Sequence, residues 1–68
     1  MTAEEWLTAF ADQIGVAAPD REQMDDVLRL AAIAAHASER IAAPIACYLA
    51  GIAGGPLDHA LEAAEGVS

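Results

Sequence analysis

The chain has 68 residues, of which 56% are hydrophobic and 4% aromatic, and 11 acids against 3 bases give it a formal net charge of −8. This balance argues against binding to nucleic acid, which depends on Lys and Arg at phosphates, and against an anionic membrane surface. The length predicts one domain, residues 1–68, and because a single cysteine excludes an internal disulfide, its small core needs close helix packing or a partner.

The first predicted helix covers residues 3–14. Thr2 and Glu5 have the spacing of a capping box at its start, and Gly15 suits the left-handed residue that commonly follows a helix. Apolar residues recur at helical spacing in between, and Trp6 widens their stripe. We expect Trp6 to anchor the core, with a contact to a partner as the alternative.

The second predicted helix covers residues 21–40. Asp20 and Gln23 repeat the capping-box spacing at its start. Apolar residues follow at helical spacing, and they make the last two turns apolar on nearly all sides. A helix with this pattern is expected to be buried on most of its surface.

The third and fourth predicted helices cover residues 44–53 and 56–65. Pro44 disfavours helix at the residue before it, so residues 41–43 are predicted to form a turn or a kink. Two glycines separate the third helix from the fourth. Pro56 is suited to the first position of a helix, where its missing N–H has no cost. Four helices with short connections and no strand pattern predict an all-α compact bundle.

The most apolar stretch lies between residues 30 and 57, and we expect the other helices to pack around it. Within it, residues 41–57 carry no permanent charge. These 17 residues are fewer than the roughly 20 that a membrane-spanning helix needs. The N-terminus also lacks the basic region and apolar run of a signal peptide. The sequence therefore predicts a cytoplasmic protein without a membrane segment.

Small residues recur every four positions through the third helix, at Ala43, Cys47, Gly51 and Gly55. Small side chains at this spacing allow two helix axes to approach closely, so we expect tight contact between the second and third helices. A groove that receives a partner's helix is the alternative. Cys47 could form a catalytic pair with His36, but a lone cysteine among alanines is more typical of a core.

Polar side chains are rare in the apolar stretch, and the candidate cluster consists of His36, Glu39, Arg40 and Tyr48. The first three are three or four residues apart, so they can share a helix face. The cluster is either structural or a point where a partner docks. In the structural interpretation, Arg40 is partly buried and donates to carbonyls freed near Pro44 or to Glu39. The sequence has no catalytic constellation and no metal-ligand spacing. We therefore expect a protein that is not an enzyme and that binds no cofactor or metal.

Several short runs carry a resemblance to a known family: Trp6-Leu7, Gly15-Val16, His36-Ala37-Ser38-Glu39-Arg40, Ala43-Pro44 and Leu49-Ala50-Gly51. The chain resembles a small uncharacterised helical domain of actinobacteria, which occurs alone or attached to MobA-type molybdopterin-guanine dinucleotide nucleotidyltransferases. This implies a partnership with molybdenum-cofactor biosynthesis or with a molybdo-oxidoreductase such as formate dehydrogenase. The glycine-rich nucleotide loop and the acidic metal site of those enzymes are missing here, so no catalytic residues are implied.

Two functions from different classes follow from these observations. The first is a non-enzymatic interaction module whose partner is a molybdenum-cofactor nucleotidyltransferase, a molybdo-enzyme or a second copy of the chain. The alternative is a binder or carrier of a small molecule, such as a nucleotide or pterin, that uses His36, Arg40 and Tyr48.

Overall fold

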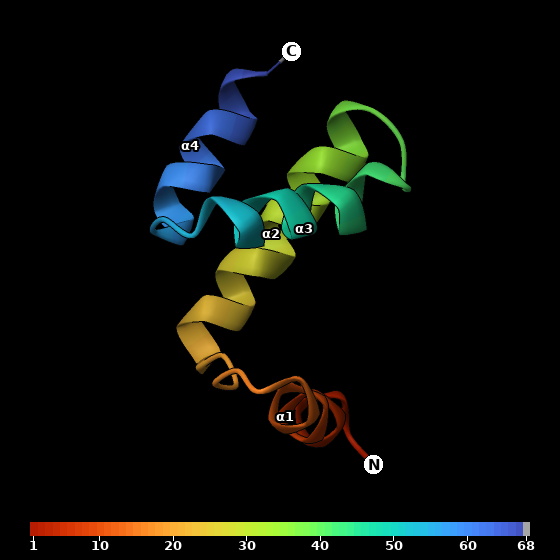
Figure 1. The fold of residues 1–68 in the computed structure, drawn as a ribbon. Coiled ribbons are helices and arrows are strands. Elements are labelled where there is room, and N and C mark those ends of the chain that lie inside the picture. The colour runs from red at the N-terminus through yellow and green to blue at the C-terminus, as the bar shows by residue number, and fades with distance from the viewer. Residues whose placement is uncertain (68) are drawn as a thin grey trace.

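The computed structural model describes residues 1–67, which form four α-helices joined by short connections and contain no β-strand. The helices are α1 (Ala3–Ile14), α2 (Arg21–Ala37), α3 (Ala42–Ala53) and α4 (Leu57–Gly66), as Figure 1 shows. The prediction of a small all-α bundle with four helices is therefore confirmed for this part of the chain. None of these helices combines the length and the apolar character needed to cross a membrane.

Local hydrogen bonds define both ends of α1, and its bounds are those predicted. The Thr2 N–H donates to Glu5 Oε1 (2.8 Å) and the Glu5 N–H donates to Thr2 Oγ1 (3.1 Å), which is the reciprocal pair of a capping box. At the other end, Gly15 has a φ of 78°, and the Val16 N–H donates to the Ala11 carbonyl (3.0 Å). This Schellman arrangement satisfies a carbonyl that the last helical turn leaves free.

The Glu5 carboxylate makes the stability of α1 depend on pH. The hydrogen bond from the Thr2 N–H, and after it the Thr2 side chain, lowers the pKa of Glu5 from its ordinary value of 4.5. Because the folded state then binds the proton less tightly than the unfolded state, Glu5 contributes stability above that value. The contribution is lost as the pH falls through the lowered folded-state pKa. We expect Glu5→Gln, which keeps an acceptor oxygen, to lose this pH dependence.

Thermal midpoints of the wild type and Glu5→Gln, recorded from neutral pH to well below 4.5, measure this effect. The difference between the two midpoints should be largest at neutral pH and should shrink as the carboxylate is protonated. Glu22→Gln is the matched control, since Glu22 lies in the first turn of α2 outside the capping box of that helix. A difference between wild type and Glu5→Gln that stays constant across the pH range would contradict the prediction.

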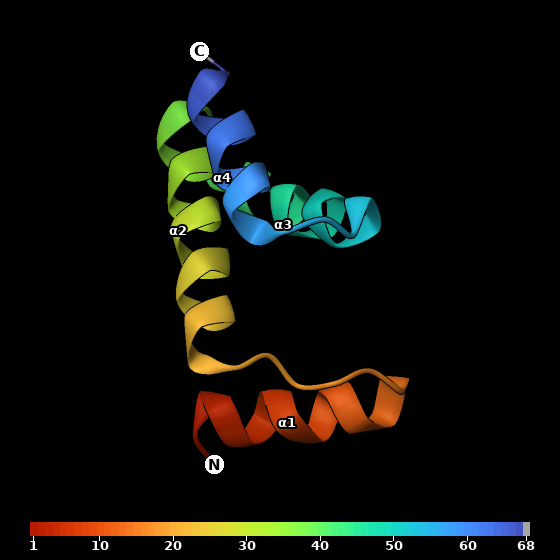
Figure 2. The same cartoon turned by 90° about the vertical axis from the view of Figure 1, so that its left-hand side faces the viewer.

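The connector between α1 and α2, residues 15–20, runs back along α1, so that α2 begins near the N-terminal end of α1 (Figure 2). Asp20 and Gln23 form the second predicted capping box. Arg21 Nη1 lies 3.1 Å from Glu4 Oε1 and joins the two helices. Both of these side chains are largely exposed, so the pair contributes no more than about 1 kcal/mol.

The C-terminal end of α2 differs from the prediction. The helix was expected to reach Arg40, but it ends at Ala37. Ser38 has a non-helical backbone (φ −139°, ψ −96°), and both its N–H and its Oγ donate to the Ala34 carbonyl (3.2 and 3.1 Å). Serine side chains compete for helical carbonyls in this way. Here the Ser38 hydroxyl helps to end α2 three residues earlier than predicted.

The start of α3 also moves, from the expected residue 44 to Ala42. The Ala42 N–H donates to the Glu39 carbonyl (2.9 Å), which begins the helix before Pro44. Pro44 is then in the first turn, where an N–H would have no partner within the helix, so proline does not interrupt it. The fourth helix begins at Leu57, within one residue of the prediction.

The central helix is α2, which packs against α3 and α4, whereas α1 makes no extended contact with another helix in the described residues. Figures 1 and 2 show that α3 and α4 lie beside the C-terminal part of α2. In the same views, α1 lies across the N-terminal end of α2. Within residues 1–67, the buried residues are Ala11 of α1, Leu30 of α2 and Leu61 of α4. The other helices were expected to surround α3, but only α2 makes extended contact with it in the part of the chain that the structure describes. The short connector keeps α1 at the far end of α2.

Candidate functional site

The predicted polar cluster does not form a bonded unit. All four of its side chains are exposed, and none makes a hydrogen bond or salt bridge within residues 1–67: His36, Glu39, Arg40 and Tyr48. The structural interpretation of Arg40 is therefore wrong. Because α2 ends at Ala37, Arg40 lies in a turn, and its carbonyl accepts from the Ala43 N–H (3.2 Å). Docking of a partner at these residues stays a prediction.

Arg40→Ala is consequently expected to change the free energy of unfolding by no more than about 0.5 kcal/mol, the usual range for a surface substitution. Denaturant unfolding of the variant and the wild type gives the difference directly. A loss of about 1–3 kcal/mol, the range for leaving buried polar groups without partners, would show instead that the guanidinium is bonded in solution.

The small residues of α3 divide into two pairs. Ala43 and Cys47 are half-buried, and Cys47 Sγ lies 3.8 Å from the Val27 carbonyl of α2. Gly51 and Gly55 are exposed, and a Cβ added to either would meet no atom within 4 Å. The small-residue stripe therefore borders α2 only in the first half of α3.

Cys47 does not have the environment of a catalytic nucleophile. Its hydrogen-bond acceptor is a backbone carbonyl of α2, and no hydrogen bond joins it to His36, with which a catalytic pair was considered. Burial raises the pKa of the Cys47 thiol, whereas reactive cysteines have a lowered pKa. Within residues 1–67, no group of three His, Cys, Asp or Glu side chains could hold a metal ion.

The outer side of α3 carries its largest side chains, although its inner side carries alanines and Cys47. Five large apolar residues of α3 and its N-cap, Ile41, are exposed at helical spacing, and we term them the α3 stripe: Ile41, Ile45, Tyr48, Leu49 and Ile52. Helices of soluble domains normally turn such residues toward the core. The α3 stripe is thus an apolar surface that the described chain leaves uncovered.

A second exposed apolar surface lies on α1, and we term it the α1 face: Trp6, Leu7, Phe10 and Ile14. The rings of Trp6 and Phe10 stack, with centroids 5.1 Å apart and planes at 20°. Trp6 is 53% exposed, so the expectation that it anchors the core is wrong. The expectation rested on the apolar stripe of α1, which is present but faces no other helix.

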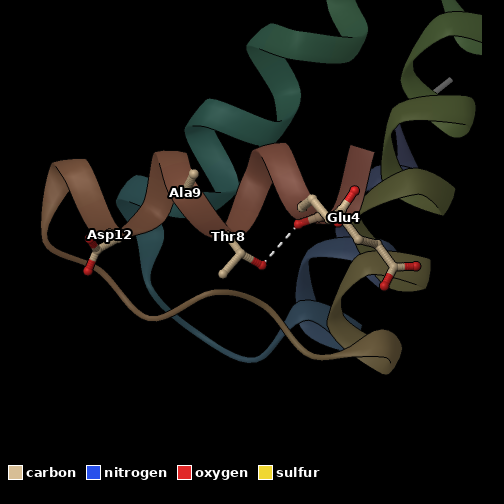
Figure 3. Close-up of a pocket in the computed structure, with 5 residues that line it drawn as sticks. Glu4, Thr8, Ala9 and Asp12 are labelled. Atoms are coloured by element: carbon tan, nitrogen blue, oxygen red, sulfur yellow. Dashed lines mark hydrogen bonds between the residues drawn. The ribbon is translucent and has the colours of Figure 1, made fainter. Parts of the chain in front are cut away.

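The other side of α1 is polar and acidic. Figure 3 shows Glu4, Thr8, Ala9 and Asp12 along this side, with Thr8 Oγ1 donating to the Glu4 carbonyl (2.9 Å). Together with Glu5 they line a shallow, open hollow. Glu4 is paired with Arg21, but Glu5 and Asp12 make no salt bridge within residues 1–67. Their negative potential favours an approaching surface that carries Lys or Arg.

An apolar hollow of about 290 Å³ lies where α2, α3 and α4 meet, and its lining consists of Ile33, Ala34, Ala37, Ser38, Ala46, Ala64 and Val67. Its volume is at the lower limit of ligand pockets, which are roughly 300–1,000 Å³. Its one side-chain hydroxyl, on Ser38, already donates to a carbonyl. None of the residues expected for a small-molecule binder lines this hollow, so it offers few groups that could orient a nucleotide or pterin.

Comparison with known families gives a match over the whole chain. The matching family model covers residues 1–68 and is described as a domain of unknown function, DUF6457. The chain belongs to the DUF6457 family. Neither the curated proteins nor the solved structures compared with it include a match. The match confirms that the chain is an uncharacterised domain, whereas the attachment to MobA-type nucleotidyltransferases stays a prediction.

This DUF6457 domain therefore presents two separate apolar surfaces, the α1 face and the α3 stripe, rather than a pocket with convergent polar groups. Sequence reasoning named Tyr48 but missed the aliphatic members of the α3 stripe. Their spacing was a usable signal, since large residues and small residues occupy opposite sides of this helix. Surfaces of this kind usually mark sites of protein–protein contact.

Proposed function

We propose that this DUF6457 domain is a non-enzymatic helical interaction module that docks through the α1 face. Its partner is a protein of molybdenum-cofactor biosynthesis, such as a molybdopterin-guanine dinucleotide nucleotidyltransferase, or a molybdo-oxidoreductase. The observation that carries this proposal is the exposed, stacked pair of Trp6 and Phe10 on a helix without extended contacts.

The composition of the α1 face suits a binding surface. Trp is among the residues that contribute most to interface energies, because a large rigid ring buries much surface at a small entropic cost. Leu7 and Ile14 add exposed aliphatic side chains to the same helix. An amphipathic helix with this pattern commonly lies in an apolar groove of its partner.

The acidic residues on and near α1 favour a partner with a basic surface. Seven of the eleven acids precede Leu30, and three of them, Glu4, Glu5 and Asp12, lie on α1 itself. A partner with basic residues around its apolar groove would therefore be attracted, and an acidic one would be repelled. The molybdenum-cofactor setting is supported by the sequence resemblance, which runs from Trp6-Leu7 to Leu49-Ala50-Gly51.

The first experiment captures proteins on the purified domain from a lysate of its source organism and identifies them by mass spectrometry. We expect enrichment of a nucleotidyltransferase of molybdenum-cofactor biosynthesis or of a molybdo-enzyme. Calorimetric titration of the purified pair then tests direct binding. Failure of both candidates to bind would overturn the proposed partnership, and a specific thermal shift with a nucleotide or pterin compound would favour the small-molecule binder instead.

A further inference from the structure

We infer that the α3 stripe is the surface through which two copies of this chain form a symmetric dimer. This assigns an occupant to a surface that the proposed function does not use, because the partner described above docks on α1. In the fold, α3 turns alanines toward α2 and its large apolar residues outward.

The exposed area of the chain is large for its mass. The accessible surface is 5321 Å², whereas a well-packed monomer of 7.0 kDa is expected to expose about 4,000 Å². The radius of gyration agrees, at 12.4 Å against about 11 Å expected for 68 residues. This excess of about 1,300 Å² belongs to the whole chain, and α1 and α3 share it because both carry uncovered apolar residues. It is more than the roughly 800 Å² that each partner buries in one interface of standard size.

The chemistry of the α3 stripe favours a second copy as the occupant. A two-fold interface places the same surface on both sides, so it must complement itself. With a net charge of −8, most surfaces of this chain would repel a second copy. The α3 stripe is the exception, because residues 41–57 contain no permanent charge, and two such helices can pack without opposing acids.

The α3 stripe offers no charges that would select a charged partner. Charge complementarity selects partners through residues around an apolar contact, and α3 has no acid or base of its own. The uncharged, largely aliphatic stripe instead matches the composition of homodimer interfaces, which are more apolar than transient ones.

Sedimentation equilibrium of the full chain tests the inference. The wild type should have about twice the 7.0 kDa mass of one chain, and its thermal midpoint should rise with protein concentration, as linkage requires for a dimer. Leu49→Glu should raise the dimer dissociation constant at least about 100-fold, because two unpaired charges would be buried. Ile14→Glu on α1 is the matched control, because Ile14 and Leu49 are 57% and 58% exposed. It should leave the dimer intact, since Ile14 lies outside the α3 stripe.

Three results would overturn the inference: a wild-type mass of one chain with a concentration-independent midpoint, a Leu49→Glu dimer, or dissociation caused by Ile14→Glu. Far-UV circular dichroism establishes that each variant is folded, and the concentration dependence of the wild type needs no variant. Failure of the dimer leaves partner binding at the α1 face unaffected, whereas failure of the partner leaves the sedimentation result unaffected. The two proposals can therefore be distinguished.

Discussion

Leu30→Ala is expected to lower the free energy of unfolding by about 2–5 kcal/mol, the range for truncating a buried leucine to alanine. Leu30 is 4% exposed and lies on α2, the helix that packs against both α3 and α4. At about 0.05–0.15 kcal/mol per residue, the whole domain is stable by only roughly 3–10 kcal/mol. The variant should therefore unfold at a much lower urea concentration, or be largely unfolded without denaturant.

Leu28→Ala is the matched control for this prediction, because it makes the same change on the same helix at a side chain that is 65% exposed. It should remain within about 0.5 kcal/mol of the wild type. Both variants are compared at a concentration where they have the same oligomeric state. Equal losses for Leu28→Ala and Leu30→Ala would mean that α2 is not the centre of the core in solution.

Trp6→Ala is expected to weaken binding of the captured partner by about 2 kcal/mol or more, which is roughly 30-fold or more in the dissociation constant. Trp6 has the largest side chain of the α1 face and stacks on Phe10, so its removal also takes away the contact that holds the neighbouring ring. Because half of the Trp6 side chain already contacts solvent, the loss of folding stability should be well below that of Leu30→Ala.

Tyr48→Ala is the matched control. Tyr48 is the one aromatic residue outside α1, it is exposed, and it belongs to the α3 stripe. It should leave the affinity for the partner unchanged and weaken self-association instead. Calorimetry with the purified partner and chemical unfolding of each variant give the two quantities separately. A Trp6→Ala variant that loses as much stability as Leu30→Ala, with unchanged partner affinity, would place Trp6 in the core rather than in an interface.

Helix positions were predictable where local residues determine them. The capping boxes at Thr2 and Asp20 and the left-handed Gly15 each act through hydrogen bonds within a few residues, so their sequence pattern is sufficient. The end of α2 was not predicted, because Pro44 was taken as the signal that stops the helix, whereas the Ser38 side chain closes it at Ala37.

The candidate site was predicted less well than the helices, because it depends on which groups the backbone satisfies and on which helix faces are covered. Arg40 was expected to donate to freed carbonyls, but those carbonyls are satisfied by the backbone N–H groups of Ala42 and Ala43. Trp6 was assigned to the core from its periodicity alone. Periodicity identifies a face of a helix, but it does not show whether another element covers that face.

The sequence by itself determined four helices, the acidic flanks and the charge-free stretch of residues 41–57, because composition, caps and periodicity are local properties. Only the tertiary structure decided which helix is central and which side of α3 is covered. A helix that is apolar on nearly all sides can pack on either its small or its large residues, and the choice depends on where the short connectors place α2 and α1. That placement turned the alanines of α3 toward α2 and left the α3 stripe and the α1 face exposed.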